Sequence, residues 1–503
     1  MDLVVRLSDD ASSLVKLPFD VLAGARKLSF ALTDLFPQFS YAVLRALEPQ
    51  YLDLLYEAQL RFSPGVLGEN ATKDFILRHV FEIAAELIKS NADLPFDNPD
   101  VRVYIDNLFV EGMLQPVEWP GTPAGWAAVG VRHDPEQDRH RCFAAILDVA
   151  EREPPGEDAR HGDWLAFARL WAEVSALACE VGAGTDPTRV FNVRSQVNVR
   201  FSEWLQQHFG SLYSLPAAPP VMVHHIARFL AAQRDGAGKV ALVVVDGLAL
   251  DQWLVIRHEV SQQRPTWRLD ENAAFAWVPT ITSVSRQSIF AGKAPLYFPS
   301  SIYSTEREAS LWQQFWVDHG LTGAEIAYLK GLGEPSMLQS IDETLSSPKL
   351  KVVGAVVDKV DRIMHGMELG AAGMHNQVRQ WAAEGFLSTV LDLMLSKGFA
   401  VYLTADHGNV ESIGCGRPKE GATADIRGER ARIYSDAVLR ANVASRFPDA
   451  ISLKPLGLPG DFLPLLSPGR SAFVQEGHRT VAHGGVTLEE AIVPFVRIVG
   501  GKG

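Results

Sequence analysis

The stretch that decides the fold runs from Lys239 to Gly247 and reads Lys-Val-Ala-Leu-Val-Val-Val-Asp-Gly. A short, continuous, β-branched run is typical of a strand that is buried on both faces of a parallel sheet. A helical pattern follows over residues 248–263. Further strand candidates are residues 275–278, 325–328, 351–357, 400–403, 431–434 and 492–498, with helices expected notably at 309–319 and 377–396. This alternation predicts an α/β fold, a mostly parallel sheet sandwiched by helices.

The first part of the chain has a different pattern. Apolar residues recur every three or four positions over residues 41–61, 74–89 and 164–181, which predicts a mainly helical N-terminal region over residues 1–213, in one or two domains. The proline-rich stretch from Leu215 to Pro220 suggests a linker with a lead-in helix over residues 214–237. Residues 238–503 then form the α/β domain.

Composition limits the classes of protein to which the chain belongs. Of its 503 residues 47% are hydrophobic, and the formal net charge is −13, which argues against a disordered chain and against a globally basic nucleic-acid-binding surface. The cysteines Cys142, Cys179 and Cys415 lie far apart, so we expect no disulfide framework, no cysteine zinc site and a reducing, cytoplasmic location. We expect no signal peptide and no membrane span, because no uncharged apolar run reaches about 18 residues.

Acidic residues and histidines follow several of the expected strands. Asp246 ends the first strand, Asp361 and His365 follow the strand at 351–357, Asp406 and His407 follow the strand at 400–403, and His483 precedes the last strand. Ligands of α/β sheets bind beyond the carboxyl ends of the strands. Asp361 and His365 are four residues apart, so on a helix they share one face. We therefore expect these side chains at one edge of the sheet.

Each of these residues also has a structural explanation when it is taken alone. Asp246 has the character of a helix cap, Asp406 and His407 suit a turn, and a charged helix face explains the 361/365 pair. Their combination at four separate places favours a metal site. Two choices stay open, because Asp358 competes with Asp361 and His478 competes with His483. Spacing favours Asp361, and the glycines at 484–485 favour His483.

The ligand types indicate the metal. Carboxylates and imidazoles without thiolates suit zinc, with manganese as the alternative. Six ligands are too many for one catalytic ion with an open position. They suit two divalent ions that clamp the attacking and leaving oxygens of a phosphoryl transfer.

A hydroxyl nucleophile is expected in the segment from Pro279 to Gly292, which follows a strand and opens a helix. A Thr or Ser hydroxyl at the start of this helix is the candidate, because a helix N-terminus favours phosphate and a bound metal lowers the pKa of a hydroxyl. Arg286, one turn further on, is positioned to hold a phosphate oxygen. The alternative is that Thr282 or Ser283 only caps the helix.

Together, these motifs resemble the alkaline phosphatase superfamily, whose members carry an ordered set of ligands around a Thr or Ser nucleophile. The nearest resemblance is to the PglZ family of BREX-type phage-defence systems. It rests on Val244-Val245-Asp246-Gly247, Pro279-Thr-Ile-Thr-Ser283, Thr404-Ala-Asp-His-Gly408 and His483-Gly-Gly-Val-Thr-Leu-Glu-Glu490, and it covers residues 238–503. It implies an alkaline-phosphatase-like fold for this part of the chain.

The resemblance also implies roles for the candidate residues. One metal site would consist of Asp361, His365 and His483, and the other of Asp246, Asp406, His407 and the Thr282 oxygen. Related nucleotide phosphodiesterases use the second Thr of a Pro-Thr-x-Thr segment as the nucleophile, which favours Thr282 over Thr280 and Ser283. The sulfatase motif is absent. Where these phosphodiesterases hold phosphate with an Asn, this chain offers Ser285 and Arg286.

The function implied is a two-metal phosphoric ester hydrolase, a phosphatase or phosphodiesterase, in antiviral defence. The alternative is a structural or adaptor subunit with a vestigial site. A phosphomutase is a third hypothesis, but the chain has little room for the domain that such enzymes insert after the nucleophile. The substrate would be a phosphate ester, nucleic acid or nucleotide included, and other BREX subunits would bind the N-terminal region. A local basic stretch near the Asp-His segment would suit nucleic acid, with a solvated loop as the favoured alternative; it consists of Arg417, Lys419, Arg427, Arg430 and Arg432.

Overall fold

The structure is a computed structural model that describes residues 2–5, 27–30, 105–110, 114–118, 125–132, 135–181, 186–234, 238–367, 369–419 and 428–501. The chain divides into two compact units, residues 1–138 and 139–503. The helices expected at 41–61 and 74–89 lie outside the described residues. The described helices and strands of the first unit are β1 (Asp2–Val5), β2 (Lys27–Phe30), α7 (Ile105–Val110), β3 (Val117–Glu118) and β4 (Val131–Arg132).

A six-stranded sheet in the order β6-β16-β9-β5-β8-β7 organises the second unit. Its strands are β5 (Lys239–Val245), β6 (Arg268–Phe275), β7 (Ile326–Leu332), β8 (Val352–Val357), β9 (Phe399–Thr404) and β16 (Ile492–Val499). β5 pairs in parallel with β8 and β9, and β7 pairs in parallel with β8. β16 is antiparallel to both β6 and β9. Only β16 therefore runs against the other five strands, and the predicted mostly parallel sheet is confirmed.

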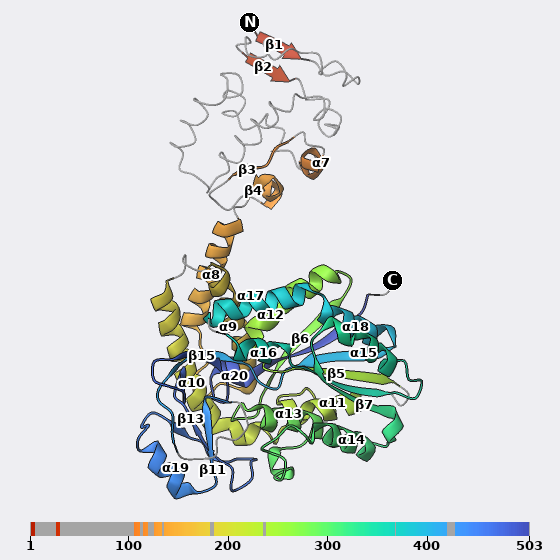
Figure 1. Cartoon of the computed structure of the whole chain (residues 1–503). Helices are drawn as coiled ribbons and strands as arrows, with labels where there is room; N and C mark the ends of the chain where they lie inside the picture. Colours follow the sequence, from red (N-terminus) through yellow and green to blue (C-terminus); the bar gives the residue numbers. More distant parts are fainter. Residues whose placement is uncertain are drawn as a thin grey trace. The chain divides into compact units, whose positions relative to one another are not determined.

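Helices cover both faces of this sheet (Figure 1), as the uniformly apolar sequence of β5 requires. One face carries α12 (Leu250–Gln263), α17 (Gly370–Ala383) and α18 (Phe386–Ser396). The other carries α11 (Ile226–Gln233), α13 (Thr282–Ala291) and α14 (Glu308–Asp318). Residues 240–245 are consequently at most 3% exposed. The remaining helices of the α/β region before β9 are α15 (Leu338–Leu345) and α16 (Lys359–His365).

Three expected elements differ from the structure. The helix expected at 377–396 is two helices, because Gly385 adopts a φ of +78° between α17 and α18. The strand expected at 275–278 is wrong except for Phe275: the strand here is β6 (Arg268–Phe275), whose last residue pairs with the first residue of β16. The strand at 431–434 exists, but it pairs in a separate antiparallel sheet.

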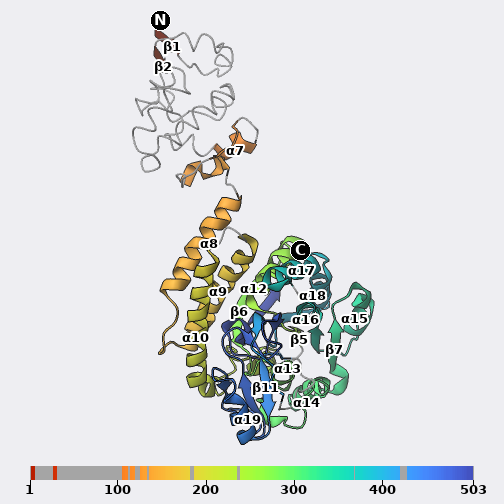
Figure 2. The ribbon, with the colours of Figure 1, turned by 60° about the vertical axis from the view of Figure 1, so that its left-hand side comes forward.

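Two long helices cover the β6 side of the sheet, α9 (His161–Val181) and α10 (Pro187–Leu212), which run side by side with α8 (Pro135–Arg152) in Figure 2. Asp186 caps α10 by accepting hydrogen bonds from two backbone amides. Trp164 of α9 packs against Phe201 of α10 with ring centroids 5.0 Å apart, and Phe201 stacks on Phe275 of β6 at 6.4 Å. The helices from residue 139 onward therefore share one core with the sheet.

Two small sheets complete the second unit. One has the order β14-β10-β15 and the other β11-β13-β12. Their strands, with the helices of this region, are β10 (Val410–Gly414), β11 (Ala431–Tyr434), α19 (Ala437–Ala444), β12 (Ile451–Ser452), β13 (Leu463–Leu466), β14 (Ser471–Ala472), β15 (Arg479–Ala482) and α20 (Leu488–Ala491). Among the described residues, no helix combines the length and the apolar character needed to cross a membrane.

Candidate metal centre

The segments that carry the candidate ligands meet at one edge of the central sheet. β5, β8 and β9 are parallel and paired along their lengths, so the residues that follow each strand emerge at the same edge. β16 runs in the opposite direction, and its first residue, Ile492, pairs with Phe275, the last residue of β6. The segment before β16, which includes His483, therefore reaches this edge as well.

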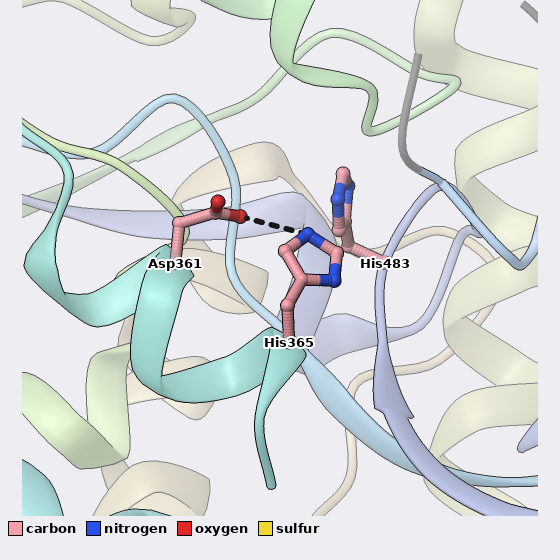
Figure 3. Close-up of side chains that lie close together, drawn as sticks. All are labelled: Asp361, His365 and His483. Carbon is pink, nitrogen blue, oxygen red and sulfur yellow. Dashed lines mark ion pairs between the residues drawn. The ribbon is translucent and has the colours of Figure 1, made fainter. Parts of the chain in front are cut away.

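The first cluster consists of Asp361, His365 and His483, and one ligand atom from each residue lies within 4.8 Å of the others. Asp361 and His365 are one turn apart on α16, and Figure 3 shows their side chains pointing toward each other and toward His483. His365 Nε2 lies 3.3 Å from Asp361 Oδ1. One carboxylate and two imidazoles at this separation form a ligand set that zinc accepts.

The second cluster consists of Asp246, Asp406 and His407, again with ligand atoms within 4.8 Å of one another. All three residues are buried. Asp406 Oδ1 accepts hydrogen bonds of 3.1 Å from the backbone amides of Gly247 and His407. These bonds fix the carboxylate, so that its other oxygen is left for the cluster.

The two clusters lie next to each other. The rings of His407 and His483 stack with centroids 3.9 Å apart and an interplanar angle of 8°. The antiparallel pairing of β10 with β15 accounts for this contact. Val410, the first residue of β10, lies opposite Ala482, the last residue of β15. His407 precedes β10 and His483 follows β15, so both histidines lie at the same end of the paired strands. Gly408 is required here, since a Cβ on it would lie 1.9 Å from the Glu489 carbonyl oxygen.

Backbone carbonyls orient both of these histidines. His407 Nδ1 lies 3.0 Å from the carbonyl oxygen of Gly408, and His483 Nδ1 lies 2.9 Å from that of Thr280. A carbonyl accepts a hydrogen bond, so each ring carries its proton on Nδ1. Nε2 of both rings keeps its lone pair, which is the arrangement that a metal-binding histidine needs.

The electrostatics of the site favour a bound cation. Burial lowers the pKa of His407 to about 4, and burial together with His407 lowers the pKa of His483 to about 4. Burial and the neighbouring Asp246 carboxylate raise the pKa of Asp406 well above its usual range. Burial opposes the ionisation of Asp361, but the hydrogen bond and charge of His365 outweigh it and lower the pKa to about 2. The His407 and His483 imidazoles are therefore neutral at pH 7, so they can bind a cation through Nε2.

Three hydroxyls of the nucleophile segment have different surroundings. Thr282 begins α13, and its Oγ1 lies 2.9 Å from His407 Nε2. Ser283 instead donates to the Ile302 carbonyl oxygen at 2.6 Å. Thr280 Oγ1 donates to the Gly485 carbonyl oxygen at 2.9 Å and accepts from the amide of residue 484 at 3.0 Å. Thr282 is therefore the hydroxyl beside the clusters, and Thr280 ties the His483 loop to α13.

Arg286 is buried one turn after Thr282, but its partners are carboxylates. Its Nη1 forms an ion pair with Asp246, and its Nε donates to Glu308 Oε1 at 2.8 Å. Ser285, the other residue considered for phosphate, is fully buried and donates to the Asp406 carbonyl oxygen at 2.5 Å. Ser285 thus has a structural contact in place of a free hydroxyl.

The structure also places the competing ligand candidates. His478 is exposed, on the turn before β15, and it belongs to neither cluster. Asp358 precedes α16 and contributes to neither cluster of the described residues. Burial, with the Asp246 charge, raises the pKa of Asp358 to about 6. The four-residue spacing to His365 and the glycines that follow His483 thus selected the two residues that the structure brings into the first cluster.

Sequence reasoning missed several neighbours of the clusters. Glu429 Oε1 lies 3.8 Å from His365 Nδ1, and Glu308 anchors Arg286. Asn409 donates to the Gly247 carbonyl oxygen at 2.7 Å and accepts from Gln252 at 2.8 Å, which ties the loop after β9 to the loop after β5. Only Asn409 had a signal, its place beside Asp406-His407; the glutamates are isolated in the sequence.

Only part of the basic stretch near the Asp-His segment lies on the surface. Arg430 is fully buried and pairs with Glu490 at 2.9 Å, and Arg432 is buried and donates to the Phe473 carbonyl oxygen at 3.0 Å. Arg417 and Lys419 are exposed, and residue 427 lies outside the described residues. The hypothesis of a continuous basic patch is therefore wrong for its two buried arginines, which have internal partners.

Buried atoms test whether these residues fit a cation. Asp246 Oδ1, Asp406 Oδ2 and His483 Nε2 are buried and have no hydrogen-bond partner among the described residues. A buried polar atom without a partner costs about 1–3 kcal/mol. Three such atoms, all electron-pair donors and all within the two clusters, fit divalent cations as their missing partners.

The fold and this site define an alkaline-phosphatase-like domain. Residues 224–498 match the family model described as "BREX system PglZ alkaline phosphatase-like domain". The match covers more than half of the chain, which therefore belongs to the PglZ family. No curated protein matches the chain.

Solved structures give more distant likenesses. Murine ectonucleotide pyrophosphatase/phosphodiesterase 5 is 10% identical, with 51% of this chain and 87% of that chain covered and a TM-score of 0.36. The human protein is 10% identical, with 52% of this chain and 88% of that chain covered and a TM-score of 0.37. Phosphonoacetate hydrolase from Sinorhizobium meliloti 1021 is 15% identical, with 52% of this chain and 90% of that chain covered and a TM-score of 0.30. The family match carries the assignment, and these likenesses do not add to it.

Proposed function

We propose that this protein is a two-metal phosphoric ester hydrolase, a phosphatase or phosphodiesterase, of a BREX-type phage-defence system. The observation that carries the proposal is the convergence of two three-ligand clusters beside the Thr282 hydroxyl at one edge of the sheet. The family match supports it, because the matched domain is alkaline phosphatase-like.

Each cluster would hold one divalent cation, zinc or alternatively manganese. The first would use Asp361, His365 and His483, and the second Asp246, Asp406, His407 and the Thr282 oxygen. Bound at these positions, such ions supply Lewis acidity that stabilises negative charge on oxygen.

The residues of the chain would bind and orient the ester. Thr282 is the proposed nucleophile, since its Oγ1 is held at the clusters and the positive end of the α13 dipole favours an incoming phosphate. Arg286 would hold a phosphate oxygen with the Nη groups of its guanidinium, because Nε is bonded to Glu308. The substrate would be a phosphate ester, a class that includes nucleotides and nucleic acids.

The experiment is a comparison of neighbouring hydroxyls. Thr282→Ala in the metal-loaded full chain should lose at least about a thousandfold in hydrolysis of an aryl phosphomonoester and a bis-aryl phosphodiester, as expected for loss of a nucleophile. Ser283→Ala is the matched control, because this hydroxyl faces Ile302, and its turnover should be kept. Elemental analysis should show nearly unchanged metal in both variants. Unchanged turnover in Thr282→Ala would remove Thr282 from this role.

A second candidate function is an adaptor subunit with a vestigial site. It is favoured by the ion pair of Arg286 with Asp246, since this cluster already holds a positive charge. The same assays separate the two functions: an adaptor would hydrolyse neither ester at any zinc or manganese concentration.

The division of the chain into functional parts is also proposed. Residues 238–503 would form the catalytic domain, and residues 1–213 would bind other BREX subunits, although the helices α9 and α10 of this region share a core with the central sheet. Residues 214–237 would connect the two parts in sequence. We place the protein in the cytoplasm, where its free cysteines, Cys142, Cys179 and Cys415, would stay reduced.

A further inference from the structure

We infer that the two clusters bind their cations unequally, because Arg286 is an internal cation of the second cluster. The first cluster would fill first, and the second ion would bind in competition with the Arg286 guanidinium. This inference rests on the proposed function, since it assumes that both clusters bind metal.

The position of Arg286 is fixed by its burial. The residue is 3% exposed and lies on α13, one turn after the proposed nucleophile. Nη1 forms an ion pair with Asp246 Oδ2 and lies 3.8 Å from Asp406 Oδ2. One guanidinium nitrogen therefore contacts both carboxylates that the second metal would use.

The charges of the two clusters differ in consequence. Arginine keeps its positive charge at every accessible pH, and a divalent ion bound to Asp246 would have a like charge beside it in a site that excludes water. The first cluster has the opposite surroundings. Asp361 and His483 form no ion pair with an arginine or lysine of the described residues, and the Glu429 carboxylate lies 3.8 Å from His365. A cation is thus favoured more strongly in the first cluster.

Glu308 holds Arg286 from the other side. It is fully buried, and besides the 2.8 Å bond from Arg286 it accepts hydrogen bonds from Tyr328 at 2.6 Å and contacts Lys330 at 3.0 Å. Arg286 is therefore shared between two carboxylates. When a metal occupies Asp246, the Nε bond to Glu308 can persist, and the released Nη groups can turn to a phosphate oxygen. Phosphate would then offset the like charges and strengthen binding of the second ion.

The test measures metal binding instead of turnover. The full chain, stripped with a chelator and dialysed, is titrated with Zn²⁺ against a competing chelator to obtain the stoichiometry and both dissociation constants. The wild type should bind one ion at least about tenfold more tightly than the second, a difference of about 1.4 kcal/mol. Arg286→Met should tighten the second ion at least about tenfold. Glu308→Gln should weaken it severalfold, because Arg286 then pairs more strongly with Asp246.

The first ion is the internal control, since its ligands form no ion pair with Arg286 among the described residues. Its affinity should stay within about twofold in both variants, which also reports correct folding. Arg257→Met removes an arginine that pairs with Glu271, outside the clusters, and should change neither constant. Inorganic phosphate should tighten the second ion in the wild type and lose that effect in Arg286→Met.

The possible outcomes separate the two proposals. Two ions of equal affinity in the wild type, or an Arg286→Met variant whose second ion binds no more tightly, would overturn the unequal loading and leave the proposed function intact. A wild-type chain that binds neither Zn²⁺ nor Mn²⁺ would overturn the proposed function and this inference together.

Discussion

The two clusters use similar ligands, but the chain builds them differently. The first takes two ligands from one turn of α16 and the third from the loop after β15, and it is partly exposed. The second takes its ligands from the ends of β5 and β9 and is buried throughout. Local spacing therefore assembles most of the first cluster, whereas the order of strands in the sheet assembles the second.

The difference also concerns the charge around each cluster. A glutamate, Glu429, lies beside the first cluster, and an arginine, Arg286, lies inside the second. A carboxylate near a ligand histidine raises its basicity, while a fixed guanidinium competes with an incoming metal. Two clusters of similar composition can thus differ in affinity because of neighbours that are not ligands.

Removal of one carboxylate from each cluster should have the largest effect. Asp361→Ala should lose the tight ion and Asp406→Ala the weak one, so that each variant keeps at most one ion and loses at least about a hundredfold in hydrolysis. Elemental analysis after dialysis measures the ions. Asp358→Asn is the matched control, because this half-buried aspartate belongs to neither cluster, and it should keep both ions. Full occupancy in Asp361→Ala would break the assignment of the first cluster.

Glu429→Gln should have a smaller effect, confined to the first cluster. The side chain lies 3.8 Å from His365 Nδ1, and loss of such a supporting carboxylate costs about 10- to 100-fold in metal affinity. Chelator competition should show a weakened first ion and an unchanged second ion. The control is Glu476→Gln, on the exposed turn before β15. Equal weakening of both ions would mean that Glu429 acts on the fold and not on His365.

The smallest expected effect is on how the stability of the metal-free chain depends on pH. One buried histidine from each cluster contributes to this dependence. The pKa is about 4 for His407 and His483 in the folded chain and about 6.5 when unfolded. As the pH falls, each histidine takes up a proton in the unfolded chain before it does so in the folded chain. Its contribution to the free energy of unfolding is therefore fully present above about pH 7 and is lost as the pH falls toward 4. Between pH 7.5 and 5.5, each histidine should cost about 1.4 kcal/mol of the free energy of unfolding.

Urea unfolding with EDTA present measures this pH dependence. His483→Gln and His407→Gln should each reduce the loss by a similar amount, although the clusters differ in exposure. The exposed His478→Gln is the control and should leave the dependence unchanged. A pH dependence in His483→Gln that equals the wild type would contradict the neutral, buried state of this ring.

Much of the first cluster was predictable, and much of its environment was not. The spacing of Asp361 and His365 follows from the helical repeat. In the second cluster, Thr282 was favoured by the resemblance of the Pro-Thr-Ile-Thr segment to that of related phosphodiesterases. Glu429 and Glu308 carried no such signal, since each is distant in sequence from the residue that it contacts. The predicted phosphate role of Arg286 did not include its two carboxylate partners, because ion pairs between separate elements have no sequence pattern.

The sequence by itself determined the strands of the central sheet except β6, most of the helices of the α/β region, and the residue types at the strand ends. These features depend on local periodicity and on the residues that directly follow each strand. Only the tertiary structure decided that β16 runs antiparallel and so brings His483 to the shared edge. It also decided that α9 and α10 pack on β6 and that a guanidinium lies among the buried carboxylates. These features depend on contacts between segments far apart in the chain, which are selected by burial and charge compensation across the whole unit and not by any local pattern.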